Sequence, residues 1–212
     1  HGADFRWSQL ASNQFEDVTG FEEIIGESRA VKEIVIKASQ YALRNVTTLI
    51  LGESGTGKEL FARAMHNAGP RRNKPFVSIN CAALTKDLLE SALFGHVQGA
   101  FTGAVRDHQG AFAQAHEGTL FLDEIGECSP DMQAMLLRVL QPPKGANSTT
   151  RVFTSVGDNK DTEVDVKVIS ATNRDLLTEV EEGAFRDDLF YRLANVTLKL
   201  PPLRERGKDV EL

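Results

Sequence analysis

The sequence predicts an α/β fold in which helices cover both faces of a parallel sheet. Two observations lead to this prediction. Short apolar runs alternate with amphipathic helical patterns, and strands that are separated by helices pair in parallel. A glycine-rich loop also joins the first apolar run to a helix. A chain of 212 residues with 41% hydrophobic content can bury one sizeable core. We therefore expect one domain over residues 18–212, preceded by a polar tail or cloning remnant at 1–17.

The strands and helices follow from the spacing of apolar residues and from turn residues. Ser28 is a plausible N-cap for a helix to about Leu43, and Ser129 followed by Pro130 marks another helix start. We expect residues 95–107, with three glycines, to form a loop, and residues 144–162 to form an exposed hairpin or a long loop. The predicted strands are 46–51, 76–80, 119–124, 164–170 and 196–200. The predicted helices are 28–43, 58–68, 84–93, 129–140, 175–182 and 185–193.

Charge and cysteine content exclude several classes of protein. A net charge of −6 argues against general binding to nucleic acid or to a membrane surface, although a local basic loop would be compatible with it. Cys81 and Cys128 are too few and too far apart to predict a disulfide framework or a metal knuckle. No apolar run approaches the ~20 residues that span a bilayer, and no signal peptide opens the sequence. We expect core thiols, a cytoplasmic location and no contact with a membrane.

The glycine-rich loop has the spacing of a phosphate-binding loop. Gly52, Gly57 and Lys58 satisfy the pattern G-x-x-x-x-G-K between an apolar strand and a helix. Glycines let backbone N–H groups face phosphate oxygens, and the lysine adds a positive charge. Glu59 stands where serine or threonine commonly ligates Mg²⁺. The alternative is a flexible turn without a ligand.

Acidic and amide side chains follow two of the predicted strands. The run TLFLDE ends in Asp123 and Glu124, some 65 residues after Lys58. In α/β sheets, ligand chemistry lies at the carboxyl ends of strands. Asp123 is suited to hold Mg²⁺ and Glu124 to activate water. Asn173 ends another strand beside them. The alternatives are a solvated acidic strand end and a turn or cap asparagine.

Two further features have two interpretations each. Phe101 lies in the glycine-containing loop, where an aromatic ring is either tucked against the domain or offered to a partner; composition alone favours the tucked ring. Arg186 and Arg192 flank apolar residues on one helix. They form either a salt-bridged surface or a contact with a phosphate on a neighbouring subunit.

The motifs, taken together and in order, resemble one family over about residues 21–212. GESGTGKE, LFGH, GAFTGA, GTLFLDEIGE, LLRVLQ, ATNRDL, FRDDLFYRL and LPPLRERG are similar to the AAA+ domains of bacterial enhancer-binding proteins, the ATPases that activate sigma-54 RNA polymerase. GAFTGA, at residues 99–104, narrows the resemblance from phosphate-binding-loop ATPases in general to this family. The fold it implies is the AAA+ core of the P-loop NTPases, and it favours a Phe101 offered to a partner.

The resemblance implies a role for each matching residue. Glu124 is similar to the Walker B glutamate, Asn80 to its switch residue, Asn173 to sensor I, and Arg186 and Arg192 to arginine fingers supplied to a neighbouring subunit. Residues expected to bind ATP and Mg²⁺ are Ile24, Ile25, Gly26, Gly52, Glu53, Ser54, Gly55, Thr56, Gly57, Lys58, Glu59 and Asp123, the last as the Mg²⁺ ligand. Residues expected to contact sigma-54 are Gly99, Ala100, Phe101, Thr102, Gly103 and Ala104.

The resemblance implies an ATPase that acts in a hexameric or heptameric ring and remodels the closed promoter complex. Val97 and Gln98 differ from the charged residues common there in the family, and 142–150 looks longer than usual. The family's helical lid would begin near Leu212, so we expect the sequence to lack it, and contacts with promoter or enhancer DNA to belong to other domains. The alternatives are a general AAA+ protein remodeller, which the GAFTGA loop disfavours, and a nucleotide-binding module that is inactive without its lid.

Overall fold

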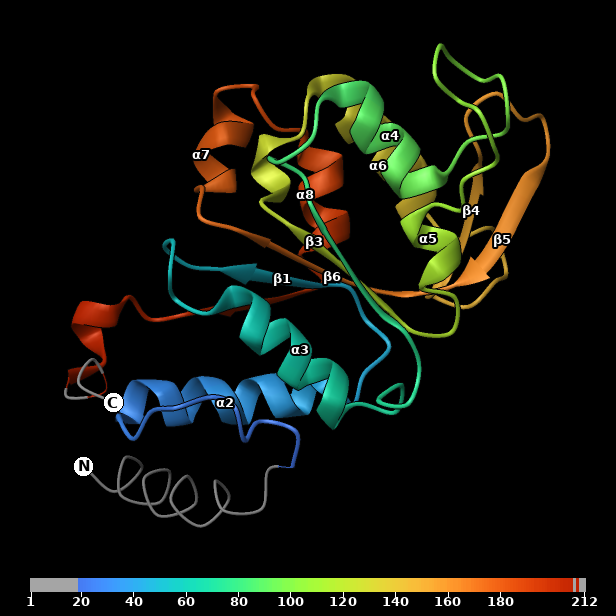
Figure 1. The fold of residues 1–212 in the computed structure, drawn as a ribbon. Helices are drawn as coiled ribbons and strands as arrows, with labels where there is room; N and C mark the ends of the chain where they lie inside the picture. The colour runs from blue at the N-terminus through green and yellow to red at the C-terminus, as the bar shows by residue number, and fades with distance from the viewer. Residues whose placement is uncertain (1–18, 208, 210–212) are drawn as a thin grey trace.

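A five-stranded parallel sheet lies at the centre of the protein (Figure 1). The structure is a computed structural model that describes residues 19–207 and Asp209; the predicted tail at 1–17 lies outside the described residues. The strand order is β2-β3-β6-β1-β7, and all neighbours are parallel. The strands are β1 (Thr48–Leu51), β2 (Phe76–Asn80), β3 (Thr119–Asp123), β6 (Lys167–Thr172) and β7 (Val196–Lys199). The predicted α/β class is confirmed.

Helices cover both faces of this sheet (Figure 1). One face carries α2 (Arg29–Ala42) and α3 (Lys58–Ala68). The other carries α4 (Lys86–Phe94), α5 (Ala111–Gln114), α6 (Pro130–Leu140), α7 (Leu176–Glu181) and α8 (Asp187–Leu193). Two short 3₁₀ helices, η1 (Ile125–Glu127) and η2 (Leu203–Glu205), follow β3 and β7. In the part of the chain that the structure describes, no helix is long and apolar enough to cross a membrane.

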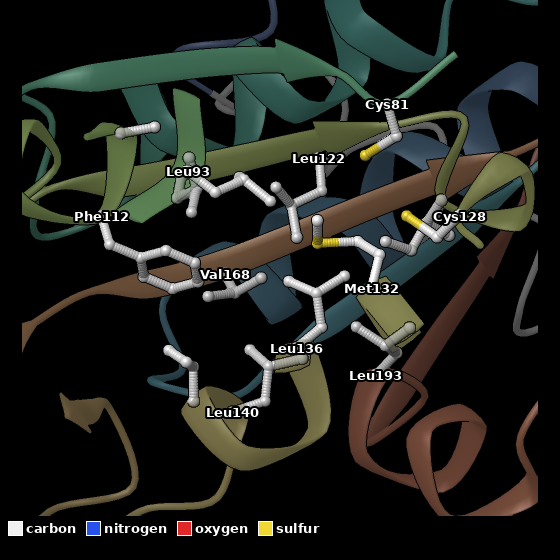
Figure 2. Close-up of a cluster of buried hydrophobic side chains, with 14 of the residues drawn as sticks. Cys81, Leu93, Phe112, Leu122, Cys128, Met132, Leu136, Leu140, Val168 and Leu193 are labelled. Atoms are coloured by element: carbon white, nitrogen blue, oxygen red, sulfur yellow. The ribbon is translucent and has the colours of Figure 1, made fainter. Parts of the chain in front are cut away.

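Alternation along the strands divides the buried side chains into two cores. Leu49 faces the core under α4, α6 and α8, whereas the next residue, Ile50, faces the core under α2 and α3. Figure 2 shows the first core, where Leu122 and Val168 of the sheet lie among α6 side chains such as Leu136. The larger set labelled there also includes Cys81, Leu93, Phe112, Cys128, Met132, Leu140 and Leu193. Both cysteines are buried free thiols, as predicted.

The predicted helix starts are confirmed at their caps. The Ser28 hydroxyl accepts a hydrogen bond from Val31 N–H at the start of α2, and the Ser129 hydroxyl accepts one from Met132 N–H at the start of α6. Asp175 caps α7 in the same way. Each cap satisfies an N–H group that has no partner within its helix. These local bonds fix where the helices begin relative to the strand ends.

The predicted strand 164–170 is wrong as a single element. Residues Asp161–Asp165 form β5, which pairs antiparallel with β4 (Thr150–Thr154), and the chain enters the central sheet only at Lys167. The hairpin predicted within 144–162 is present, but one side of it is buried. Phe153 packs against Phe94 and Phe112, with ring centroids 6.0 and 5.8 Å apart. This aromatic packing covers a hairpin that its polar composition predicted to be exposed.

Candidate functional site

The glycine-rich loop connects β1 to α3 as a compact turn. Gly55 and Gly57 have φ values of 79° and 89°, in the left-handed region that glycine enters without steric cost. The Thr56 hydroxyl donates to the carbonyl of Glu53 at 2.8 Å. A Cβ atom at Gly52 would lie 2.7 Å from that hydroxyl oxygen. The loop therefore needs glycine at these three positions, and it ends at the amino terminus of α3, where unpaired N–H groups favour an anion.

Lys58, the first residue of α3, is buried and lies across the loop. Its ammonium donates to the Gly52 carbonyl at 3.1 Å and lies 3.4 Å from Oε1 of Glu124. Glu53, Ser54 and Glu59 are exposed. The Glu59 carboxylate pairs with Arg63 at 3.2 Å along the helix. The positive charge available to a ligand at this loop thus comes from Lys58 and the helix terminus.

The two acidic residues leave β3 in different directions. Asp123 ends the strand half-buried, and its carboxylate accepts a hydrogen bond from the Glu124 N–H at 3.0 Å. Glu124 has φ 51° and ψ 48°, an uncommon conformation for a residue with a side chain. The prediction of strand through 124 was therefore one residue too long. The left-handed turn allows the Glu124 carboxylate to reach both Lys58 and the Asn173 N–H, 3.3 Å away. Such strain at a strand end is typical of functional positions.

The environment of Asp123 fits a divalent cation. Burial raises the pKa of Asp123, and the adjacent Glu124 carboxylate raises it further, so the charge of Asp123 is incompletely compensated. The described residues contain no group of three or more His, Cys, Asp or Glu side chains that could hold a metal. Mg²⁺ commonly takes only one or two carboxylates, with phosphate and water oxygens as its other ligands. The donor set suits Mg²⁺ bound together with a nucleotide.

Asn80 ends β2 and Asn173 directly follows β6, the two strands that flank β3 and its acidic pair. Asn80 lies beside Asp123 in the sheet register. Its side-chain oxygen accepts hydrogen bonds from the N–H groups of Ala82 and Ala83, at 2.9 and 3.2 Å. Among the described residues, Asn80 has no hydrogen bond to Glu124, and Asn173 reaches Glu124 through its backbone. The structure thus brings Lys58, Glu124 and Asn173 together and leaves the Asn80 side chain bonded to its own turn.

Arg186, the N-cap of α8, and Arg192, within α8, lie away from this cluster. The Arg186 guanidinium forms an exposed ion pair with Asp188 at 2.8 Å, and the backbone N–H of Arg186 donates to the Gln133 side-chain oxygen. In residues 19–207 and 209, neither arginine forms a hydrogen bond or ion pair with the loop or the acidic pair. Within this one chain they do not contribute to the site.

The loop at 99–104 is a closed turn on a fixed base. Gly99 N–H donates to the Ala104 carbonyl at 2.9 Å, which closes the turn. At its base, His96 pairs with His108, and Val97 N–H donates to Val156 of the β4–β5 hairpin. Phe101 is 41% exposed, and its ring meets His96 edge-on with centroids 4.9 Å apart. The ring is thus partly tucked against His96 and partly exposed, and its contact with a partner stays a prediction.

Three residues that follow β7 also contact the site, and their role was not predicted from the sequence. Arg206 donates to the Thr56 carbonyl, Arg204 pairs with Glu53, and Asp209 accepts from the N–H groups of Glu27 and Ser28. The last contact lies directly after Ile24–Gly26, where Ile25 is exposed. In the sequence, their segment is a charged run. The motif LPPLRERG was the one available indication that this segment has a role.

Comparisons with known proteins agree on one family. The model of the sigma-54 interaction domain matches residues 24–199. The Nif-specific regulatory protein of Azotobacter vinelandii is 52% identical over 192 residues, which cover 90% of this chain and 35% of that protein. The transcriptional regulatory protein GlrR of Escherichia coli is 49% identical over 191 residues, covering 90% and 41%. The chain therefore spans about two fifths of the length of these relatives or less.

Solved structures give the same result for the fold. The crystal structure of NtrX from Brucella abortus in complex with ADP superposes with a TM-score of 0.80 at 35% identity, covering 97% of this chain and 44% of that chain. The same protein in complex with ATP gives a TM-score of 0.78. The core described above is thus shared with a protein that binds both nucleotides.

Proposed function

This chain belongs to the sigma-54 interaction family, the AAA+ domains of bacterial enhancer-binding proteins, and we propose that it hydrolyses ATP to drive contact with sigma-54 RNA polymerase. One observation carries the enzymatic part of the proposal. The Lys58 ammonium and the Glu124 carboxylate, 66 positions apart in the sequence, lie 3.4 Å apart at the carboxyl edge of the sheet. This edge is where α/β sheets bind ligands.

Each residue of the site has a task in this proposal. Gly52–Lys58 and the α3 terminus bind the phosphates, and Ile24–Gly26 lie near the adenine. Asp123 holds Mg²⁺, which when bound neutralises charge on the phosphate oxygens. Glu124 orients the attacking water and accepts its proton. Asn173 fixes the position of Glu124 through its backbone N–H.

In this proposal, the ion pair between Lys58 and Glu124 is the resting arrangement of the site. An arriving γ-phosphate competes for the Lys58 ammonium, because both ligands are anions and the lysine is buried. Glu124 is then released to bind water or the Asn80 amide. The Asn80 side chain would donate from Nδ2, and turning it toward Glu124 draws its oxygen away from the N–H groups of Ala82 and Ala83. A ligand moves an equilibrium only by binding its two states with different affinity, and this exchange of partners provides such a difference.

Arg186 and Arg192 act in a neighbouring subunit of a hexameric or heptameric ring. The Arg186–Asp188 pair is exposed, and exposed ion pairs contribute little free energy. The arginine therefore leaves this partner at low cost to meet a phosphate in the next subunit. An arginine placed there stabilises charge that spreads over the phosphate oxygens in the transition state. Hydrolysis then depends on assembly.

The turn at 99–104 contacts sigma-54. Phe101 and Thr102 lie at the exposed part of this turn, and the base of the turn rests on the β4–β5 hairpin. In this proposal residues 18–212 form one AAA+ α/β unit. The net charge of −6 leaves contact with promoter or enhancer DNA to regions outside these residues.

Binding to purified sigma-54 tests this proposal. The chain is mixed with sigma-54 in the presence of ADP and a metal fluoride, and binding and steady-state ATPase activity are measured side by side. We expect nucleotide-dependent binding that Thr102→Ala abolishes while ATPase activity is retained. Thr154→Ala, at an exposed threonine on β4, is the matched control and should leave both unchanged.

Two outcomes would contradict the assignment of roles. Loss of ATPase activity in Thr102→Ala would place the loop within the catalytic machinery. ATPase activity without any binding to sigma-54 would favour a general protein remodeller.

A further inference from the structure

The segment after β7 turns back to the phosphate-binding loop and places an arginine beneath it. Arg206 is only 8% exposed. Its guanidinium donates from Nη2 to the Thr56 carbonyl at 2.6 Å and from Nε to the Pro201 carbonyl at 3.0 Å. One side chain therefore connects the end of the sheet with the middle of the loop.

The burial of this guanidinium has a cost that its hydrogen bonds and the nearby Asp209 charge offset. Burial lowers the pKa of Arg206, which means that the charged form is disfavoured at this position. Hydrogen bonds from a charged donor are about twice as strong as neutral ones. Among the described residues, both acceptors of these bonds are backbone carbonyls. The contact with Thr56 is thus a strong, buried restraint on one peptide group of the loop.

The restraint sets the direction of an N–H group. A trans peptide is planar, so its C=O and N–H bonds point in opposite directions. Because the Thr56 carbonyl is bound by Arg206, the N–H of Gly57 in the same peptide group faces away from Arg206. Gly57 has a φ of 89°, and glycine rotates freely enough to allow other orientations of this peptide. A loop that is flexible at this bond needs an external restraint.

We propose that Arg206 is a positioning residue for phosphate binding, holding the Thr56–Gly57 peptide so that Gly57 N–H is directed at the β-phosphate. This inference rests on the nucleotide site proposed above. Asp209 lies on the same turn, since its N–H donates to the Arg206 carbonyl at 3.2 Å. The Asp209 carboxylate accepts from the N–H groups of Glu27 and Ser28 at 2.8 and 3.0 Å. One turn of the chain thus contacts the phosphate-binding loop through Arg206 and the segment beside the proposed adenine site through Asp209.

The test compares two buried arginines that bind backbone carbonyls. Arg71 is matched to Arg206 in burial, and its guanidinium donates to the carbonyls of Gly118 and Asp165 at the amino-terminal edge of the sheet. It also pairs with the Asp165 carboxylate at 2.8 Å. Binding of ADP and of AMP is measured for the wild type, Arg206→Ala, Arg206→Lys and Arg71→Ala. Urea unfolding of each variant reports its stability.

We expect Arg206→Ala to raise the Kd for ADP about tenfold, the effect of losing one charge-assisted bond. The Kd for AMP, which lacks a β-phosphate, should change less than about twofold. Arg206→Lys keeps one charged donor and should restore part of the affinity. Arg71→Ala should lose stability while keeping the wild-type Kd for ADP.

Four outcomes would overturn the inference. Equal losses for ADP and AMP, or equal losses in the Arg206 and Arg71 variants, would mean that Arg206 only stabilises the fold. An unchanged Kd for ADP in Arg206→Ala would mean that the peptide keeps its orientation unaided. Failure of the wild type to bind ADP would overturn both this inference and the nucleotide site of the proposed function.

Discussion

Lys167 provides a quantitative test of how the sheet is joined to α2. The side chain is 4% exposed at the start of β6, and its ammonium donates to the carbonyls of Tyr41 and Ala42 at the end of α2, at 3.2 and 2.8 Å. Burial, with a smaller effect of the nearby Arg71 charge, lowers the pKa of Lys167 from 10.5 to about 8. The folded protein therefore releases this proton more readily than the unfolded chain.

The sign of the pH dependence follows from which state holds the proton. Between pH 8 and pH 10.5 the unfolded state keeps the proton and the folded state loses it, so the free energy of unfolding rises with pH in this window. Below pH 8 both states are protonated, and the contribution is constant. One pKa unit corresponds to about 1.4 kcal/mol. From pH 7.5 to pH 9.5, Lys167 should therefore add about 2 kcal/mol to stability.

Lys167→Met removes this titration while keeping a long apolar side chain. Urea unfolding of both proteins at pH 7.5 and pH 9.5 gives four free energies, and other titrating groups cancel in the comparison of the two pH responses. We expect the wild type to gain about 2 kcal/mol relative to the variant on going to pH 9.5. Identical pH responses of the two proteins would refute the argument, because they would mean that water reaches the ammonium in the folded state.

Two further predictions concern the ATPase activity of the assembled ring and binding to sigma-54. Glu124→Gln and Arg186→Ala should each be inactive as ATPases. An equal mixture of the two variants should recover about a quarter of the wild-type rate, because about a quarter of the interfaces then pair an intact glutamate with an intact arginine. A mixture as inactive as its components would place the arginine in its own subunit's site. Gly157→Ala would put a Cβ 2.7 Å from the Cβ of Ala100 and should weaken sigma-54 binding with unchanged ADP affinity. Gly145→Ala, with a φ of 84° and no atom within 4 Å of the added Cβ, is the control, and an equal effect there would implicate backbone strain alone.

Helix caps and turn residues predicted most of the elements, because they act through bonds between residues that are close in the sequence. α3 and β2 have the predicted bounds, and Ser28 and Ser129 cap the helices they were expected to begin. Caps and glycine turns depend on bonds between residues a few positions apart. The convergence of residues 58, 124 and 173 was also predictable, because the carboxyl ends of parallel strands meet at one edge.

The errors lie where distant contacts override the local pattern. Residues 164–165 continue the alternating pattern of β6, yet they pair with β4 because Phe153 and Val164 of this hairpin are buried in the same core as α4 and α5. Glu124 leaves the strand because Lys58 and Asn173 N–H bind its carboxylate. Arg206 also escaped prediction, because the charge pattern of this segment does not indicate which of its residues will turn inward. The roles of Arg186 and Arg192 in a neighbouring subunit stay predictions, since one chain contains only half of each interface.

The arrangement around α4 indicates how the nucleotide site and the loop at 99–104 could move together. Asn80 bonds the N–H groups of Ala82 and Ala83, just before α4 begins at Lys86, and α4 ends at Phe94, directly before the base of the loop. A helix transmits displacement along its length because its hydrogen bonds resist bending and stretching. If the Asn80 side chain turns to donate from Nδ2 to the Glu124 carboxylate and its oxygen leaves these N–H groups, the turn before α4 loses its restraint. The hydrogen bond from Val97 N–H to the Val156 carbonyl still holds the base of the loop. Movement of α4 would then tilt the turn that carries Phe101 rather than translate it, because one side of its base stays attached to the hairpin.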